Sequence, residues 1–146
     1  MIPEYFGVYN EKTGRHFLID SECGTIWGYL TNAGNENTTS SETKVDCHLW
    51  IGEIYDNKNG WGRGDVPKIP NEYKGDRFKF ISPTEDELSI LWSLDGHGCL
   101  VVINNHVIAF CHAELARNGQ NIWCSTASSI CSVFDDGLFK SIKWAY

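Results

Sequence analysis

Imidazole and thiol groups are the side chains of this chain best suited to metal binding or catalysis, and one pair of them is closely spaced. The chain contains five histidines and six cysteines, and His97 and Cys99 lie two positions apart. Positions i and i+2 of a strand share a face, so this pair could bind a metal ion or act as a thiol nucleophile with its base. The sequence contains no C-x₂-C pair, which structural zinc sites typically use. We therefore expect no metal and no cofactor.

Carboxylates are the second group that could do chemistry. Glu85, Asp86 and Glu87 are consecutive, and a glycosidase would need two such groups about 5–9 Å apart in a sugar cleft. Consecutive acidic residues are more typical of a solvated turn, or of a surface that docks a basic protein. Over the whole chain, 12 basic against 19 acidic residues give a net charge of −7. This charge disfavours binding to nucleic acids and to anionic membranes, and it points to a cationic partner or simply to solubility.

A long loop carries aromatic rings beside further carboxylates. Residues 56–75 contain four glycines and two prolines around Trp61, and loops of this length in a compact domain are often functional. Exposed rings beside carboxylates suit a protein interface or a sugar-stacking surface. Together with the acidic triplet, the loop supplies the residues that we expect to contact a partner: Asp56, Trp61, Asp65, Glu72, Glu85, Asp86 and Glu87.

Strands are the elements that must position these groups. Apolar and polar residues alternate over 46–54 and 88–94, and two apolar runs follow, separated by Asn104-Asn105. Asparagine tolerates positive φ, so this dipeptide predicts a two-residue hairpin and residues 88–111 should form a three-stranded meander. Shorter strands are expected at 5–9, 16–19, 25–30, 77–81, 121–125 and 141–146.

Helical signals are few. Residues 128–136 place Ile130, Val133 and Phe134 at helical spacing before Gly137, although the acidic pair at 135–136 opposes the helix dipole and should keep this helix short. A capping pattern at 82–85 predicts one acidic turn that leads into the strand at 88. The length suits a single domain, 1–146. We therefore expect an α+β fold that is predominantly antiparallel β, with a β-meander sheet, sandwich or half-barrel and one or two short helices.

The amino terminus and the cysteines bear on the compartment. Residues 1–5 show no basic segment followed by an apolar one, and no apolar run approaches the about 18 residues that cross a bilayer. We therefore expect a cytoplasmic protein with reduced, mostly buried thiols. In a secreted chain, six cysteines would instead allow three disulfides.

The predicted meander resembles part of a known functional class. Its central residues are Leu94-Asp-Gly-His-Gly-Cys-Leu-Val-Val-Ile-Asn-Asn-His-Val-Ile-Ala-Phe110. This order of a D-G-x-G turn, an apolar strand, a turn and an I-A-F strand is similar to the central meander of bacterial immunity proteins of contact-dependent and type VI toxin systems. The resemblance implies a protein without catalysis or cofactor. It also implies a cognate toxin, often a nuclease, whose active site is occluded by acidic and aromatic side chains.

Three functions therefore stay open. The first is a non-catalytic inhibitor that neutralises a cationic cognate toxin. The second is a carbohydrate-binding β domain in which Trp50 and Trp61 stack against sugar rings. The third is a small thiol or carboxylate hydrolase that uses His97, Cys99 and the acidic triplet. The first agrees best with the net charge of −7 and with the resemblance.

Overall fold

Two β-meanders and one short α-helix form most of the described part of the chain. The computed structural model describes residues 5–20, 24–34, 37, 39, 42–53, 71–75, 88–129 and 131–146. The first meander consists of β1 (Tyr5–Tyr9), β2 (His16–Asp20), β3 (Thr25–Thr31) and β4 (Val45–Glu53), and each strand pairs antiparallel with the next. The strands predicted in this half of the chain are confirmed.

The second half forms a matching meander. Its strands are β5 (Leu88–Trp92), β6 (Gly98–Ile103), β7 (His106–His112) and β8 (Ala116–Asn121). Asn104 and Asn105 join β6 to β7 with φ values of 50° and 66°, as the two left-handed positions of a type I′ turn require. The predicted three-stranded meander and its hairpin are therefore confirmed.

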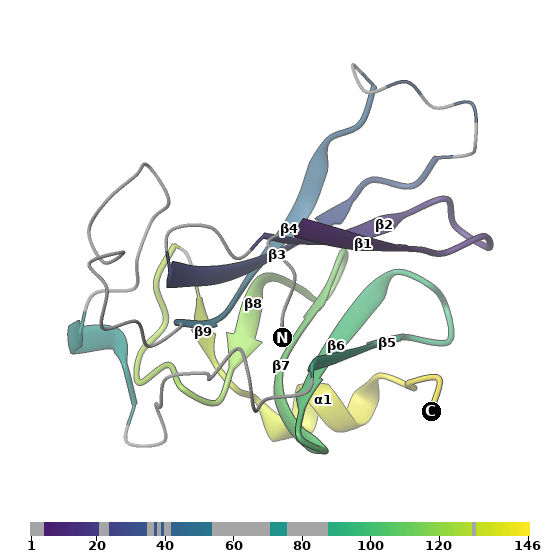
Figure 1. Cartoon of the computed structure of the whole chain (residues 1–146). Coiled ribbons are helices and arrows are strands. Elements are labelled where there is room, and N and C mark those ends of the chain that lie inside the picture. Colours follow the sequence, from purple (N-terminus) through teal and green to yellow (C-terminus); the bar gives the residue numbers. More distant parts are fainter. Residues whose placement is uncertain are drawn as a thin grey trace.

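The two meanders join through their last strands. β4 runs parallel to β8, with His48 opposite Asn118, which gives the order β1-β2-β3-β4-β8-β7-β6-β5. Gly119 permits the close approach, because a Cβ atom there would collide with the side chain of Leu49 and lie 2.9 Å from its Cα atom. The short β9 (Ser132–Val133) continues the sheet beside β8. Figure 1 shows the first meander lying above the second.

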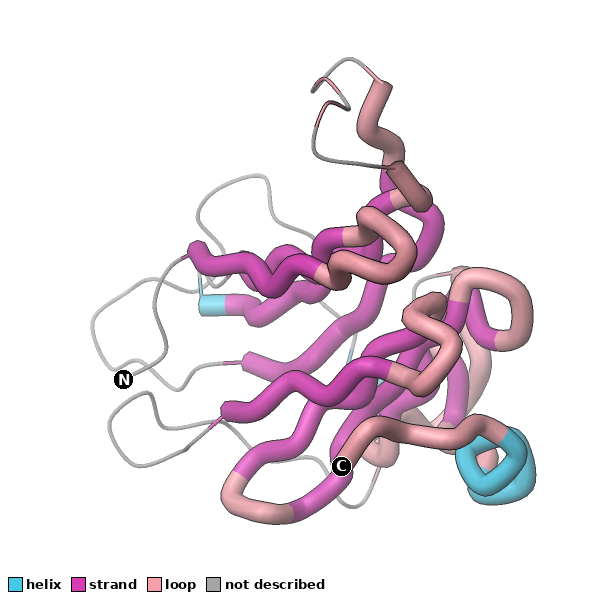
Figure 2. The backbone as a smooth tube through the Cα atoms, turned by 90° about the vertical axis from the view of Figure 1, so that its right-hand side faces the viewer, coloured by secondary structure: helices cyan, strands magenta, loops and turns pink. Residues whose placement is uncertain are grey.

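Polar contacts between turns hold the curled sheet together at one end. β1 and β5 are the outermost strands of the order, yet the turn after β1 touches the turn after β5. Thr13 Oγ1 donates to the carbonyl of Gly96 (3.1 Å) and Lys12 Nζ to that of Leu94 (3.1 Å). Because the sheet curls (Figure 2), buried residues of both meanders, such as Trp50 and Val101, share one apolar cluster.

The helix α1 (Asp136–Ser141) covers the outer face of the second meander. The Asp135 side chain caps it by accepting a hydrogen bond from the backbone N–H of Leu138 (3.0 Å). Trp144, beyond the helix, packs with Leu100 and Phe110 in a second apolar cluster. The described fold is therefore mostly antiparallel β with one short helix, which confirms the expected class.

Three predicted elements are wrong. The helix expected at 128–136 is a loop with β9, and α1 begins at Asp136 instead, because an acidic pair suits the N-terminal end of a helix dipole. The strand expected at 141–146 reduces to one bridge between Trp144 and Ser93. Of the strand expected at 121–125, only Asn121 lies in a strand, as the last residue of β8. Its side chain accepts a hydrogen bond from the Trp123 N–H (2.7 Å) and starts a turn. The elements expected at 77–81 and 82–85 lie outside the described residues.

The expectation of reduced thiols is wrong for one pair of cysteines. Cys124 and Cys131 form a disulfide. β8 and β9 run parallel, so the connection between them loops back and brings these two residues together. Cys47, Cys99 and Cys111 are free and buried, as expected.

Candidate binding pocket beside the helix

Only one of the residues predicted to contact a partner lies in the described ranges. Glu72 is exposed in the 3₁₀ helix η2 (Asn71–Tyr73), and its backbone carbonyl accepts a hydrogen bond from Ser125 Oγ (3.1 Å). The others stay predictions, because they lie outside the described residues: Asp56, Trp61, Asp65, Glu85, Asp86 and Glu87.

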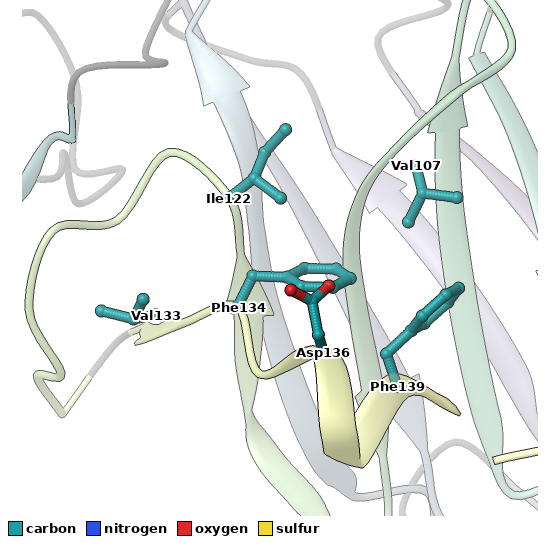
Figure 3. Close-up of a pocket in the computed structure, with 6 residues that line it drawn as sticks. All are labelled: Val107, Ile122, Val133, Phe134, Asp136 and Phe139. Atoms are coloured by element: carbon teal, nitrogen blue, oxygen red, sulfur yellow. The ribbon is translucent and has the colours of Figure 1, made fainter. Parts of the chain in front are cut away.

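A pocket of about 430 Å³ lies between the second meander and the helix. Its aliphatic wall comes from Val107 on β7, Ile122 after β8 and Val133 on β9. Phe134 and Phe139 supply two aromatic rings, as Figure 3 shows. The remaining lining residue is Asp136, at the start of α1, whose side chain projects from the helix toward the same space (Figure 3).

The two rings of the pocket belong to a larger aromatic cluster. The Phe110 ring lies 5.2 Å from Phe134 in an edge-on contact and 5.7 Å from Phe139, between ring centroids. Trp144 stacks on Phe139 at 5.9 Å and donates its Nε1–H to the Phe139 carbonyl (3.3 Å). Rings held on several sides keep their orientation without a ligand. The pocket is therefore preformed.

Asp136 adds a negative charge to this apolar pocket. Its side chain is exposed, and among the described residues it makes no hydrogen bond and no ion pair. The neighbouring Asp135 is engaged in capping α1. Lys140, one turn further along the helix, forms no ion pair with Asp136 within the described structure. The arrangement can therefore bind a group that is cationic at one end and apolar along its length.

Sequence reasoning missed this pocket, although one local signal was present. The segment from Phe134 to Phe139 reads Phe-Asp-Asp-Gly-Leu-Phe and places two rings around two carboxylates. By itself, the acidic pair bears on where a helix begins or ends and does not indicate a pocket. Val107 and Ile122 come from other strands, and no spacing in the sequence joins them to Phe134.

The geometry around His97 does not suit thiol chemistry. Arg15 Nε donates to His97 Nδ1 (3.0 Å), and Arg15 Nη1 bonds Asp46 Oδ2 (2.7 Å) and the Thr31 carbonyl (2.8 Å). His97 therefore links the two meanders through a buried guanidinium. Cys99 is fully buried, and burial raises the pKa of its thiol well above the ordinary value. A protonated, buried thiol is a poor nucleophile.

A hydrolytic triad contains the same residue types as Ser93, Asp95 and His112, but here the hydrogen bonds connect them in a different order. Asp95 lies between the other two: Ser93 Oγ donates to Asp95 Oδ1 (2.5 Å), and His112 Nε2 contacts Asp95 Oδ2 (2.9 Å). In a triad, the histidine lies between the serine and the carboxylate and removes the serine proton. Ser93 is also only 3% exposed. This cluster therefore serves to hold the turn after β5.

Two further cysteines and one tryptophan bear on the remaining hypotheses. Cys111 is fully buried, and its hydrogen bond to Cys47 together with burial raises the pKa of its thiol. Trp50, which the sugar-binding hypothesis placed on an exposed strand face, is fully buried. That expectation is wrong, because the sheet curls and encloses both faces of β4 at this point. The sugar-binding hypothesis then depends on Trp61, which lies outside the described residues.

Comparisons with known proteins add no family to these observations. No protein-family model, no curated protein and no solved structure matches the chain. Among the described residues, no three histidine, cysteine, aspartate or glutamate side chains are grouped to hold a metal ion. Of the helices that the structure describes, none has the length and apolar character that crossing a bilayer requires.

Proposed function

We propose that this chain is a non-catalytic binding protein that neutralises a cationic protein toxin by covering the toxin's active site, as bacterial immunity proteins do. The observation that carries the proposal is the preformed pocket in which a carboxylate, Asp136, stands among apolar and aromatic side chains. The net charge of −7 supports a basic partner, since opposite charges steer the encounter and select the partner. Nucleases are one toxin class that fits, because their active clefts bind phosphates and are basic.

The chemical state of the thiols and of the serine supports binding rather than catalysis. Cys99 and Cys111 are fully buried and their pKa values are raised. The proton of Ser93 is directed at a carboxylate and not at an imidazole. Cys99, Cys111 and Ser93 are therefore enclosed in the fold and not placed for nucleophilic chemistry. The surface groups at the pocket are the ones available to a partner.

The proposal is tested with the protein encoded next to this one in the genome. That protein is expressed in bacteria with and without this chain, and its affinity for the purified chain is measured by calorimetry at low and high ionic strength. We expect growth to be restored by this chain, and the affinity to fall by about tenfold or more at high salt, since exposed charge pairs are screened. A neighbouring protein that binds equally well at both salt concentrations, or that stays toxic beside this chain, would contradict the proposal.

The acidic triplet provides a separate test of the predicted contact residues. Replacing Glu85, Asp86 and Glu87 by alanine should slow association and reduce its salt dependence while stability stays unchanged. If association is as fast as for the unmodified chain, these residues are solvated and do not belong to the docking surface.

A further inference from the structure

We infer that the pocket beside α1 receives an arginine side chain of the partner protein. This inference rests on the proposed function, because it names the group through which a basic partner would be recognised. The occupant must be apolar along its length, planar enough to lie against a ring, and positively charged at its end. Arginine combines these three properties, since its guanidinium stacks on aromatic faces and also pairs with carboxylates in a fixed fork geometry.

The walls of the pocket match the parts of this side chain. Val107, Ile122 and Val133 offer aliphatic surface for the methylene stem, which arginine readily buries. The rings of Phe134 and Phe139 contact each other, with centroids 5.4 Å apart, so the guanidinium would stack against one ring and would not lie between the two. Attraction of a cation to such a ring operates within about 6 Å of its centroid.

Asp136 determines the charge of the occupant. Its carboxylate makes no hydrogen bond or ion pair in the described part of the chain, so it is available to a donor from outside. A purely apolar side chain in the pocket would remove water from this carboxylate without replacing the lost hydrogen bonds, which is unfavourable. An anionic group would be repelled. A lysine would satisfy the charge, but its compact ammonium lacks the flat surface that stacks on an aromatic ring.

The site can be probed without the partner. The probe is N-acetyl-arginine N-methylamide, titrated into the isotope-labelled chain at low salt and followed by NMR. The lysine and norleucine analogues serve as matched probes that lack the planar group and the charge, respectively. We expect a dissociation constant in the range of about 1–10 mM for the arginine probe, with the largest shifts at Val107, Ile122 and Phe139. The lysine probe should bind about threefold more weakly, and the norleucine probe should cause no saturable shift.

A single charge substitution sharpens the test. Asp136→Asn should weaken the arginine probe about threefold to fivefold and change stability by no more than about 0.5 kcal/mol, because the side chain is exposed and loses only its interaction with the N-terminal end of α1. Glu114→Gln, which removes an exposed carboxylate in the turn between β7 and β8, is the control and should change nothing. Equal binding of the arginine and norleucine probes, shifts confined to other residues, or an unaffected Asp136→Asn variant would overturn the inference.

The toxin assay distinguishes failure of the inference from failure of the proposed function. If the chain protects against its toxin and Asp136→Asn protects and binds equally well, the pocket inference is wrong and the proposed function stands. If the arginine probe binds as expected but no toxin is neutralised, the pocket is an arginine site and the proposed function is wrong.

Discussion

Replacing Asp95 by asparagine tests how the turn after β5 is held. Asp95 accepts three hydrogen bonds, from Ser93 Oγ (2.5 Å), the His97 N–H (2.9 Å) and His112 Nε2 (2.9 Å). The Nδ1 atom of His112 accepts from the Glu114 N–H (3.2 Å), so the proton of this imidazole lies on Nε2. In Asp95→Asn, one carboxylate oxygen becomes an NH₂ group, which cannot accept a hydrogen bond. If the NH₂ group takes the place of Oδ2, it faces the Nε2 proton of His112. If it takes the place of Oδ1, the hydrogen bonds from Ser93 Oγ and the His97 N–H are lost.

The expected cost follows from the burial of these partners. His112 and Ser93 are each only 3% exposed, and leaving a buried donor without a partner costs about 1–3 kcal/mol. The Asp95 side chain itself is 52% exposed, so solvent screening lowers this value, and we expect a loss of about 1–2 kcal/mol. For a chain of this size, that loss corresponds to a fall in Tm of about 3–6 °C.

The pH dependence of the effect has a definite sign. Partial burial raises the pKa of Asp95, but the hydrogen bonds from Ser93, the His97 N–H and His112 outweigh it and hold the pKa well below its ordinary value. A carboxylate whose pKa is lower in the folded state stabilises the fold above its unfolded pKa of about 3.9. This stabilisation is lost as the pH falls toward the folded value. The deficit of Asp95→Asn should therefore be present above about pH 5 and shrink toward about pH 2.

The measurement is urea unfolding followed by tryptophan fluorescence, since the chain has six tryptophans. Asp136→Asn makes the same chemical change at an exposed residue outside this hydrogen-bond network and should stay within about 0.5 kcal/mol of the unmodified chain. If Asp95→Asn is as stable as this control, or if its deficit is the same at about pH 5 and about pH 2, the reasoning is refuted.

Three further predictions concern stability and thiol reactivity. Reducing the Cys124–Cys131 disulfide, or replacing both residues by serine, should lower the free energy of unfolding by about 2 kcal/mol; an unchanged urea midpoint would contradict this. Gly119→Ala should cost about 1–3 kcal/mol, because its Cβ atom would lie 3.1 Å from the backbone oxygen of His48 and collide with Leu49. Gly137→Ala is its control, because its Cβ atom would lie 3.3 Å from the exposed Asp135 side chain and not against a packed strand, and it should change stability by no more than about 0.5 kcal/mol. Equal midpoints for the two variants would argue against a close β4–β8 contact. The free thiols of Cys47, Cys99 and Cys111 are buried, so an aromatic disulfide reagent should modify these three only on unfolding. Rapid modification of any of the three in the native state, located by peptide mapping, would contradict the described core.

Local patterns account for the parts of the fold that were predicted correctly. Alternation over 88–94 places side chains on two faces, and Asn104-Asn105 adopts its turn because asparagine tolerates the left-handed region. The prediction failed at 128–146, where helical spacing and strand alternation were both weak. There the cap at Asp135 and the packing of Trp144 against Phe110 decide the structure. The candidate loop 56–75 stays largely a prediction, since only its last residues are described.

Most strands of the two meanders, the hairpin and the acidic balance follow from residues that are neighbours along the chain, whereas β8 was not predicted. The tertiary structure alone decided which strands join, which cysteines bond and where a pocket forms. Arg15 reaches His97, and β7 meets α1 at the pocket, only after the sheet has curled. Such contacts depend on the packing of segments far apart in the sequence, and no local periodicity records that packing.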